Sequence, residues 1–247
     1  MLTAGVDLAA EPVRTALAMV AWDGQKAVVT ELICGVGDDA ILTALTGTDK
    51  AGIDCPLGWP EEFVAFLAGH KAGHVTVPGS LTGQQWRRRL AWRRTDEAVR
   101  EQTGLIPLSV SADRIGHAAM RCAGLLSKLA SRGQPVDRAG TGAVAEVYPA
   151  ASLKCWSLPY RGYKQLRNPT TLGALVDDLL AAAPWLHLGP YEGLCRTSHD
   201  AADAVIAALT ARAAVLGLAT RPDAEQETAA RSEGWIALPT SPLSQLV

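Results

Sequence analysis

The chain has 247 residues, of which 48% are hydrophobic and 19% charged, so it can bury a core and is not a disordered protein. Its formal net charge of −2 excludes a strongly basic, generic nucleic-acid binder. No window approaches ~18 uninterrupted apolar residues, so we expect no membrane span, and the N-terminus lacks the pattern of a secretory signal. The five cysteines are scattered and form no CxxC pair, which disfavours a disulfide framework or a zinc cluster and favours reduced thiols in the cytoplasm.

The first third of the chain predicts three strands, a helix and a fourth strand. Short apolar runs are separated by turn signals such as Asp23-Gly24, which is typical of a hairpin. Asp38 precedes apolar residues at helical spacing. The expected strands cover residues 2–8, 15–22, 26–33 and 51–57, and the expected helix covers 38–45. The predicted order is therefore βββαβ, with the first three strands antiparallel.

The rest of the chain predicts helices around one further strand. That strand covers 143–148 and begins about 85 residues after the fourth strand, whereas a plain crossover needs only ~10–12 residues. We therefore expect a single domain over 1–247 with a helical insertion over 60–142. The expected helices cover 60–67, 84–102, 116–132, 172–183 and 198–216, and the last is so apolar that it should be buried on most faces.

Acidic residues interrupt several of these apolar runs. Asp7 and Asp54 lie near the ends of expected strands, Glu146 lies within another, and Asp200 and Asp203 open the most apolar helix. A buried carboxylate is costly unless it is paired or bound to a metal ion. Hard oxygen ligands without histidine or cysteine partners favour Mg²⁺ or Mn²⁺ over zinc, and two such ions about 3.5–4 Å apart can promote phosphodiester hydrolysis.

Each of these acids also has a purely structural interpretation. An aspartate at a strand end often caps the next turn or helix, and Asp200 and Asp203 would be favoured by the positive end of a helix dipole. The joint pattern of acids on three strands and the last long helix favours a site, because few folds need carboxylates at all four places.

Seven segments carry a resemblance to a known family: GVDLA, GIDCPLGWP, RRTD, EVYPAASL, YRGYK, HDAADAVIAALTARA and EGWIALP. Together they resemble the bacterial family called domain of unknown function 429, whose members are described as predicted ribonuclease-H-like nucleases. The resemblance covers Gly5 to Pro239. It implies an α/β, ribonuclease-H-like fold: a five-stranded mixed sheet with flanking helices and a helical insertion between strands 4 and 5. It also implies that Asp7, Asp54, Glu146 and Asp200 or Asp203 surround the metal site.

Other polar residues are candidates for supporting roles. Five arginines lie between Arg87 and Arg94, and we expect Arg87, Arg93 and Arg94 to bind substrate phosphates from a helix that folds over the carboxylates. A solvated helix face, or pairing with neighbouring acids, is the alternative. His199 could position water or transfer a proton, and Lys164 could neutralise charge in the transition state. Either could equally be structural.

The leading hypothesis is a nuclease that uses two Mg²⁺ or Mn²⁺ ions and acts on nucleic acid, with DNA and RNA both open. A non-catalytic module that retained the fold to bind nucleic acid or protein is one alternative. An actin-like ATPase or phosphotransferase is another, since such proteins also begin with an aspartate at the end of a first strand. The sequence gives no indication of the oligomeric state.

Overall fold

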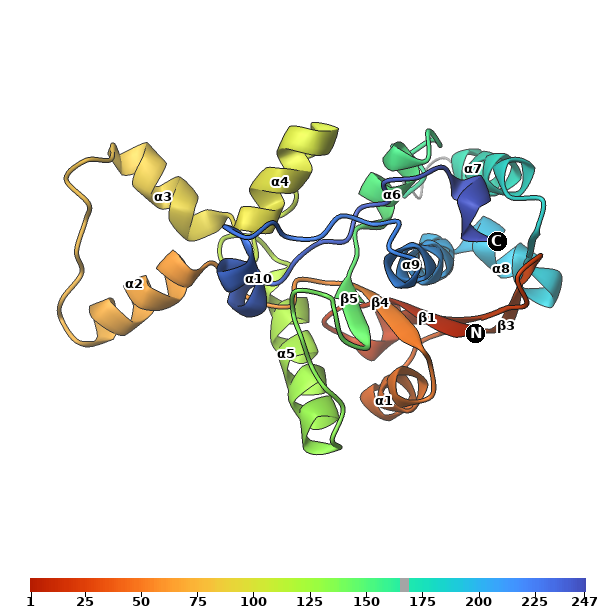
Figure 1. The fold of residues 1–247 in the computed structure, drawn as a ribbon, viewed down its shortest axis with the longest axis horizontal. Helices are drawn as coiled ribbons and strands as arrows, with labels where there is room; N and C mark the ends of the chain where they lie inside the picture. Colours follow the sequence, from red (N-terminus) through yellow and green to blue (C-terminus); the bar gives the residue numbers. More distant parts are fainter. Residues whose placement is uncertain (165–168) are drawn as a thin grey trace.

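A mixed six-stranded sheet forms the centre of the protein in the computed structural model, which describes residues 1–164 and 169–247 (Figure 1). The order of the strands across the sheet is β5-β4-β1-β2-β3-β6. β1 pairs antiparallel with β2 and parallel with β4, so it occupies the centre. The strands are β1 (Leu2–Asp7), β2 (Ala16–Trp22), β3 (Ala27–Cys34), β4 (Lys50–Asp54), β5 (Val144–Glu146) and β6 (Leu186–His187). The predicted βββαβ beginning is confirmed.

The expected count of five strands was one too low. β6 is only two residues long and pairs parallel with Ala27 and Val28 at the edge of β3. A segment this short has no alternation of side chains that a sequence pattern could reveal. The sheet is therefore mixed, as expected, with one additional short edge strand.

Helices cover both faces of the sheet (Figure 1). On one face, α1 (Asp38–Thr46) and α5 (Gly116–Ser131) share a buried apolar cluster with Ala4 and Val6 of β1. On the other face, α9 (His199–Val215) packs with α7 (Pro169–Ala182). The shorter helices α6 (Pro149–Cys155) and α8 (Glu192–Thr197) lie on the same side as α9. As predicted, α9 is almost wholly buried, from Ala201 to Ala211.

Two glycines let α9 lie directly against the sheet. A Cβ atom on Gly5 of β1 would come within 1.9 Å of the Ala204 carbonyl oxygen, and one on Gly52 of β4 within 2.5 Å of the Ala207 carbonyl oxygen. Any larger residue would push the helix away, because real Cβ atoms do not approach backbone so closely. Small residues on both sides therefore set the distance between α9 and the two central strands.

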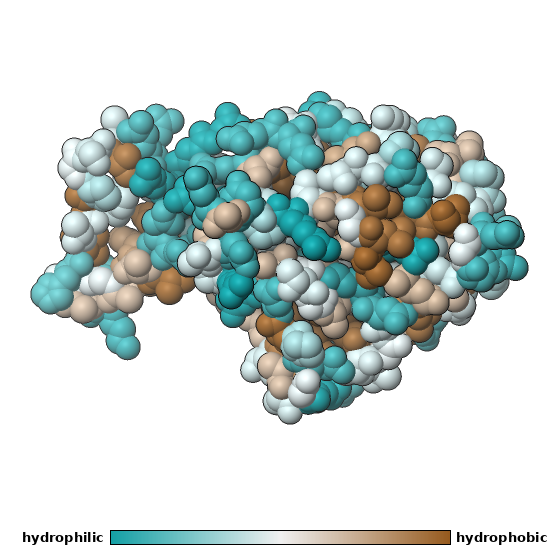
Figure 2. All heavy atoms as spheres, in the orientation of Figure 1, coloured by the Kyte–Doolittle hydropathy of each residue, from teal (hydrophilic) through white to brown (hydrophobic). Residues whose placement is uncertain are grey.

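The long connection between β4 and β5 contains four helices, which are α2 (Glu61–Lys71), α3 (Gly83–Ala91), α4 (Arg94–Thr103) and α5. α5 belongs to the main body, since Leu125 and Leu129 are buried under the sheet. α2 and α3 project as an arm at the left of Figure 1, and Figure 2 shows apolar atoms on this arm.

The single helix expected over 84–102 is in fact two. The chain is extended at Trp92 and Arg93, which separate α3 from α4. Arg93 caps α4, and its backbone N–H donates to Asp96 Oδ2 at 2.9 Å. The break allows the Arg93 side chain to leave the arginine-rich stretch and enter the protein interior, where it is 1% exposed.

The end of the chain returns to the sheet. After α10 (Glu227–Glu233), Ile236 forms an isolated parallel bridge with Glu146, and the Ala237 N–H donates to the Glu146 carbonyl oxygen at 2.9 Å. The C-terminal GWIALP segment thus extends the edge of β5. Within the described ranges, no helix has the length and apolar character needed to cross a bilayer.

Candidate functional site

Asp7 and Asp54 lie side by side at the ends of two parallel strands. The register of β1 and β4 pairs Gly5 with Gly52 and Asp7 with Asp54. Side chains two residues apart in a strand point to the same face. Both aspartates therefore point to the face that carries α9, directly beyond the glycines on which that helix rests.

α9 supplies the remaining members of the cluster. Asp203 precedes Ala204, the residue whose carbonyl lies against Gly5, and it is 0% exposed. His199 and Asp200 lie in the first turn of the same helix, which Ser198 caps by accepting a hydrogen bond from the Ala201 N–H at 3.3 Å. Because α9 packs closely against the sheet, its first two turns, with Asp200 and Asp203, lie next to the strand ends that carry Asp7 and Asp54.

These side chains form two ligand groups that share one residue. Ligand atoms of Asp7, Asp54 and Asp203 all lie within 4.8 Å of one another, and so do those of Asp7, His199 and Asp200. Asp7 is common to both groups. The carboxylate oxygens that make up most of both groups are donors suited to Mg²⁺ or Mn²⁺.

The hydrogen bonding of the cluster leaves acceptor atoms available. Tyr163 donates its hydroxyl proton to Asp203 Oδ1 at 2.8 Å, while Asp203 Oδ2 accepts no hydrogen bond of ordinary geometry from the described residues. The Lys164 ammonium nitrogen lies 2.5 Å from that Oδ2 atom and is the cation next to the cluster. Among residues 1–164 and 169–247, no side chain or backbone N–H donates to the carboxylates of Asp7 or Asp54. The arrangement therefore fits a cation better than a structural hydrogen-bond network.

Burial and mutual repulsion change the acidity of the cluster. Burial, together with the neighbouring carboxylates of Asp54 and Asp203, raises the pKa of Asp7 from 3.8 to about 9 against the opposing effect of Lys164. Burial also raises the pKa of Asp54 to about 7, opposed by Lys164. Asp203 raises the pKa of the Lys164 ammonium despite the opposing effect of burial. In the absence of a cation, Asp7 and Asp54 therefore keep their protons to a higher pH than ordinary carboxyl groups do.

Glu146, expected as a further ligand, lies in neither group. β5 pairs Ile53 with Glu146, and Ile53 belongs to the apolar cluster under α1 and α5. The Glu146 side chain therefore leaves the sheet on the face opposite to Asp54. Both of its carboxylate oxygens bind Arg93, at 2.7 Å from Nη2 to Oε1 and 2.8 Å from Nη1 to Oε2. The Leu57 N–H also donates to Oε2 at 2.9 Å.

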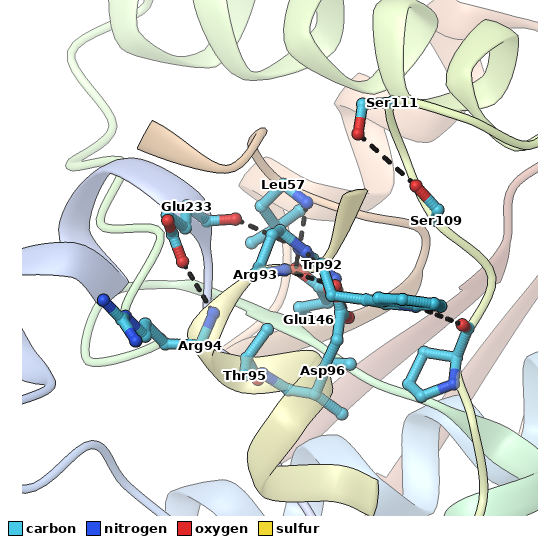
Figure 3. A network of polar contacts seen from close by, with 12 residues as sticks. Leu57, Trp92, Arg93, Arg94, Thr95, Asp96, Ser109, Ser111, Glu146 and Glu233 are labelled. Carbon is cyan, nitrogen blue, oxygen red and sulfur yellow. Dashed lines mark hydrogen bonds and ion pairs between the residues drawn. The ribbon is translucent and has the colours of Figure 1, made fainter. Parts of the chain in front are cut away.

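Arg93, expected to bind substrate phosphate, is the centre of this buried network (Figure 3). Its Nε and Nη2 atoms donate to Asp96 at 3.2 and 2.9 Å, and Nη1 also donates to the Glu233 carbonyl oxygen at 3.0 Å. Although burial alone would lower the pKa of the Arg93 guanidinium, Glu146 and Asp96 raise it. With its donors occupied by protein, Arg93 joins α4 to β5 and α10 instead of facing a ligand.

The other expected cations have different surroundings. Arg87 is exposed on α3. Arg94 is half-exposed and lies 3.6 Å from Glu62, and its backbone N–H donates to Glu233 at 2.8 Å. Lys164 alone among the four lies beside the carboxylate cluster.

One contributor was missed from the sequence: Tyr163, which holds Asp203 in place. The alternative in which the arginines pair with neighbouring acids holds for Arg93, which Asp96 shares with Glu146. Tyr163 directly precedes Lys164 in the quoted YRGYK segment, and Asp96 closes the quoted RRTD segment. Their positions in those segments were the available signal.

Comparison with known proteins places the chain in a family without assigning an activity. A search of curated proteins found no match. The family model described as protein of unknown function (DUF429) matches residues 5–227, a span that contains every member of both ligand groups. The chain therefore belongs to the DUF429 family of proteins of unknown function.

Proposed function

We propose that the protein is a nuclease: a phosphodiesterase that hydrolyses nucleic acid with the help of two divalent cations, on a ribonuclease-H-like fold. The observation that carries this proposal is the shared position of Asp7, which belongs to both ligand groups within the 4.8 Å limit. A carboxylate with two oxygens can serve two adjacent cation sites at once. Asp54 and Asp203 complete one site, and His199 and Asp200 complete the other.

Divalent cations would supply the essential chemistry when bound: they lower the pKa of water and offset the charge that develops on the phosphate. The protein's own contribution is to hold its carboxylates in place. Asp203 is fixed by the Tyr163 hydroxyl, and Asp7 and Asp54 are fixed by the register of β1 and β4. Rigid placement of this kind removes the need to reorganise charged groups during the reaction.

Two further residues have roles that depend on their position in the cluster. His199 Nδ1 lies 2.8 Å from Asp200 Oδ1, so the imidazole stands beside Asp200 in the second ligand group, where it can bind the cation or position water. The Lys164 side chain is 47% exposed, so its ammonium group reaches both the cluster and solvent. A phosphate that approaches the carboxylates would meet this cation first.

The test combines metal binding with hydrolysis. Protein freed of metal with EDTA is titrated with MnCl₂ by calorimetry and incubated with labelled single- and double-stranded DNA and RNA in Mn²⁺, Mg²⁺ or EDTA. Asp54→Asn is the test variant, and Asp178→Asn is the matched control because Asp178 is exposed on α7, away from the cluster.

We expect Mn²⁺ to bind the wild-type protein and the control, cleavage to require the metal, and Asp54→Asn to lose at least 100-fold in rate. Absence of Mn²⁺ binding by the wild-type protein would overturn the proposal. Binding without cleavage of any of the four substrates would favour the non-catalytic binding module instead.

A further inference from the structure

A cavity of about 370 Å³ opens beside the carboxylate cluster. Asp54 and Lys164 line one part of it, which connects it to the candidate site. Most of the remaining wall consists of aromatic and aliphatic side chains from the segments around α6 and before α5. We call this cavity the tyrosine pocket; its apolar wall includes Pro107, Leu108, Ile115, Tyr148, Tyr160 and Tyr163.

The aromatic wall is built from residues that have little freedom to move away. Tyr163 is buried and is held through its hydroxyl by Asp203. Tyr148 precedes α6 and packs its ring partly against a buried apolar cluster that includes Val99 and Ile236. Tyr148 is only partly buried and lines the pocket, so its ring presents a surface to a ligand.

The aliphatic side of the pocket includes an apolar side chain that is largely exposed to solvent. Leu108, in the segment between α4 and α5, lines the pocket and is 59% exposed, and Ile115 lines it as well. Together with Tyr148 these residues offer an apolar surface to a flat ligand.

A cation lies at one side of this apolar surface. Lys164 lines the pocket at its boundary with the carboxylates, whereas Lys154 and Arg161 contact the Tyr160 ring, 4.9 and 5.2 Å from its centre, without lining the pocket. The Arg93–Glu146 pair also lines the pocket, but its atoms are saturated by each other and by Asp96. A ligand that joins a flat apolar ring to an anionic group would match both features.

We propose that the tyrosine pocket binds one unpaired nucleobase of the substrate, stacked on Tyr148 with its phosphate directed toward Lys164. This inference rests on the proposed function, because it takes the substrate to be a nucleic acid. Base stacking on an aromatic side chain contributes roughly 1–3 kcal/mol and tolerates any base, since every base has a π-face. A cavity of this size lies at the lower end of the ~300–1,000 Å³ range of small-ligand sites, so it holds a single base and not a base pair.

The consequence is a preference for single-stranded substrates. A base that is paired within a duplex would first have to unstack and swing out, at a cost of a few kcal/mol. Single-stranded DNA or RNA already presents unpaired bases, so it can fill the pocket and place the adjacent phosphate near Lys164 without that cost.

The test uses two probes that differ only in the base, adenosine 5′-monophosphate and ribose 5-phosphate, titrated into the full-length protein in saturating MnCl₂. We expect the nucleotide to bind wild-type protein at least 10-fold more tightly than the sugar phosphate. Tyr148→Leu should weaken nucleotide binding by about 5- to 150-fold, which is the stacking contribution expressed as a ratio. Tyr148→Phe retains the ring and should bind as the wild-type protein does.

Two further variants protect the test against misfolding and non-specific effects. Leu108→Asp changes an exposed residue at the pocket and should weaken nucleotide binding while the thermal unfolding temperature stays constant. Tyr191→Leu is the matched control, because its hydroxyl binds the Thr30 carbonyl oxygen beside β3, far across the sheet from β4.

Equal affinity for the two probes, absence of nucleotide binding, or an unchanged affinity in Tyr148→Leu would overturn the inference. Calorimetry with MnCl₂ alone and the cleavage assay report separately on the proposed function. Metal-dependent cleavage without any contribution from the base would overturn the pocket alone. Base-dependent nucleotide binding without Mn²⁺ binding would overturn the nuclease proposal and leave the pocket standing.

Discussion

Replacing Asp7 with asparagine should stabilise the metal-free protein at neutral pH. The pKa of Asp7 is raised from 3.8 to about 9 in the folded protein, first by burial and then by Asp54 and Asp203. Between these two values the folded state binds a proton that the unfolded state has released. Stability therefore falls as pH rises through this window, and asparagine, which does not titrate, removes that loss.

The size of the effect follows from the width of the window. One proton contributes about 1.36 kcal/mol per pH unit, so the upper limit for Asp7 at pH 7 is about 4 kcal/mol. The way this stability difference changes with pH is a more specific test than its size at one pH. The free energy of unfolding of Asp7→Asn minus that of the wild-type protein should grow by about 2.7 kcal/mol between pH 5 and pH 7.

Urea unfolding followed by fluorescence measures this difference, with EDTA present throughout and the Asp178→Asn variant as a control for loss of a surface carboxylate. A less stable Asp7→Asn variant, or a difference that does not change with pH, would refute the reasoning and make Asp7 a structural hydrogen-bonding residue. In MnCl₂ the order should reverse, because only the wild-type protein retains the ligand shared by both groups.

Three other substitutions test separate parts of the structure. Arg93→Met should destabilise the protein by about 3–5 kcal/mol in urea unfolding, because two buried carboxylates lose their cation, whereas Arg94→Ala should cost less than about 1 kcal/mol; equal small effects would contradict the buried network. Gly5→Ala should lower both the unfolding temperature and the Mn²⁺ affinity, since its Cβ would meet the Ala204 carbonyl oxygen at 1.9 Å. An unchanged Mn²⁺ affinity would contradict the claim that close packing of α9 on β1 positions the ligands. Lys164→Met should raise Mn²⁺ affinity several-fold in calorimetry while slowing cleavage, because the ammonium competes with the ion for Asp203, and weaker Mn²⁺ binding would contradict that competition.

The strand-end aspartates were predictable because local sequence and topology agree. Asp7 and Asp54 each follow a glycine by two residues in a short apolar run, and parallel neighbours bring such ends to the same edge. The apolar character of α9 likewise predicted a buried helix, and a buried helix that begins with acids must bring them close to whatever it covers. These features depend on patterns of a few neighbouring residues.

The role of Glu146 depends on how β5 is aligned with β4, and local sequence patterns do not specify that alignment. β5 is buried on both faces, so its sequence shows no alternation to indicate which way Glu146 points. A shift of one residue relative to β4 would have turned it toward Asp54. The pairing of Ile53 with Glu146 instead directs it to Arg93.

The burial of Arg93 was likewise not predictable from the sequence around it. It is one of five arginines between Arg87 and Arg94, and composition gives no reason to separate it from the others. Its burial results from partners that lie 53 and 140 positions away, Glu146 and Glu233, together with the nearby Asp96. Only the tertiary arrangement distinguishes the arginine that binds the core from those that face solvent.

The central claim is most directly tested by anomalous scattering from a crystal soaked in MnCl₂. The account predicts two manganese peaks that share Asp7 as a ligand, one completed by Asp54 and Asp203 and the other by His199 and Asp200, with Glu146 still bound to Arg93. A crystal with no peak at these carboxylates, or with manganese bound by Glu146, would contradict it.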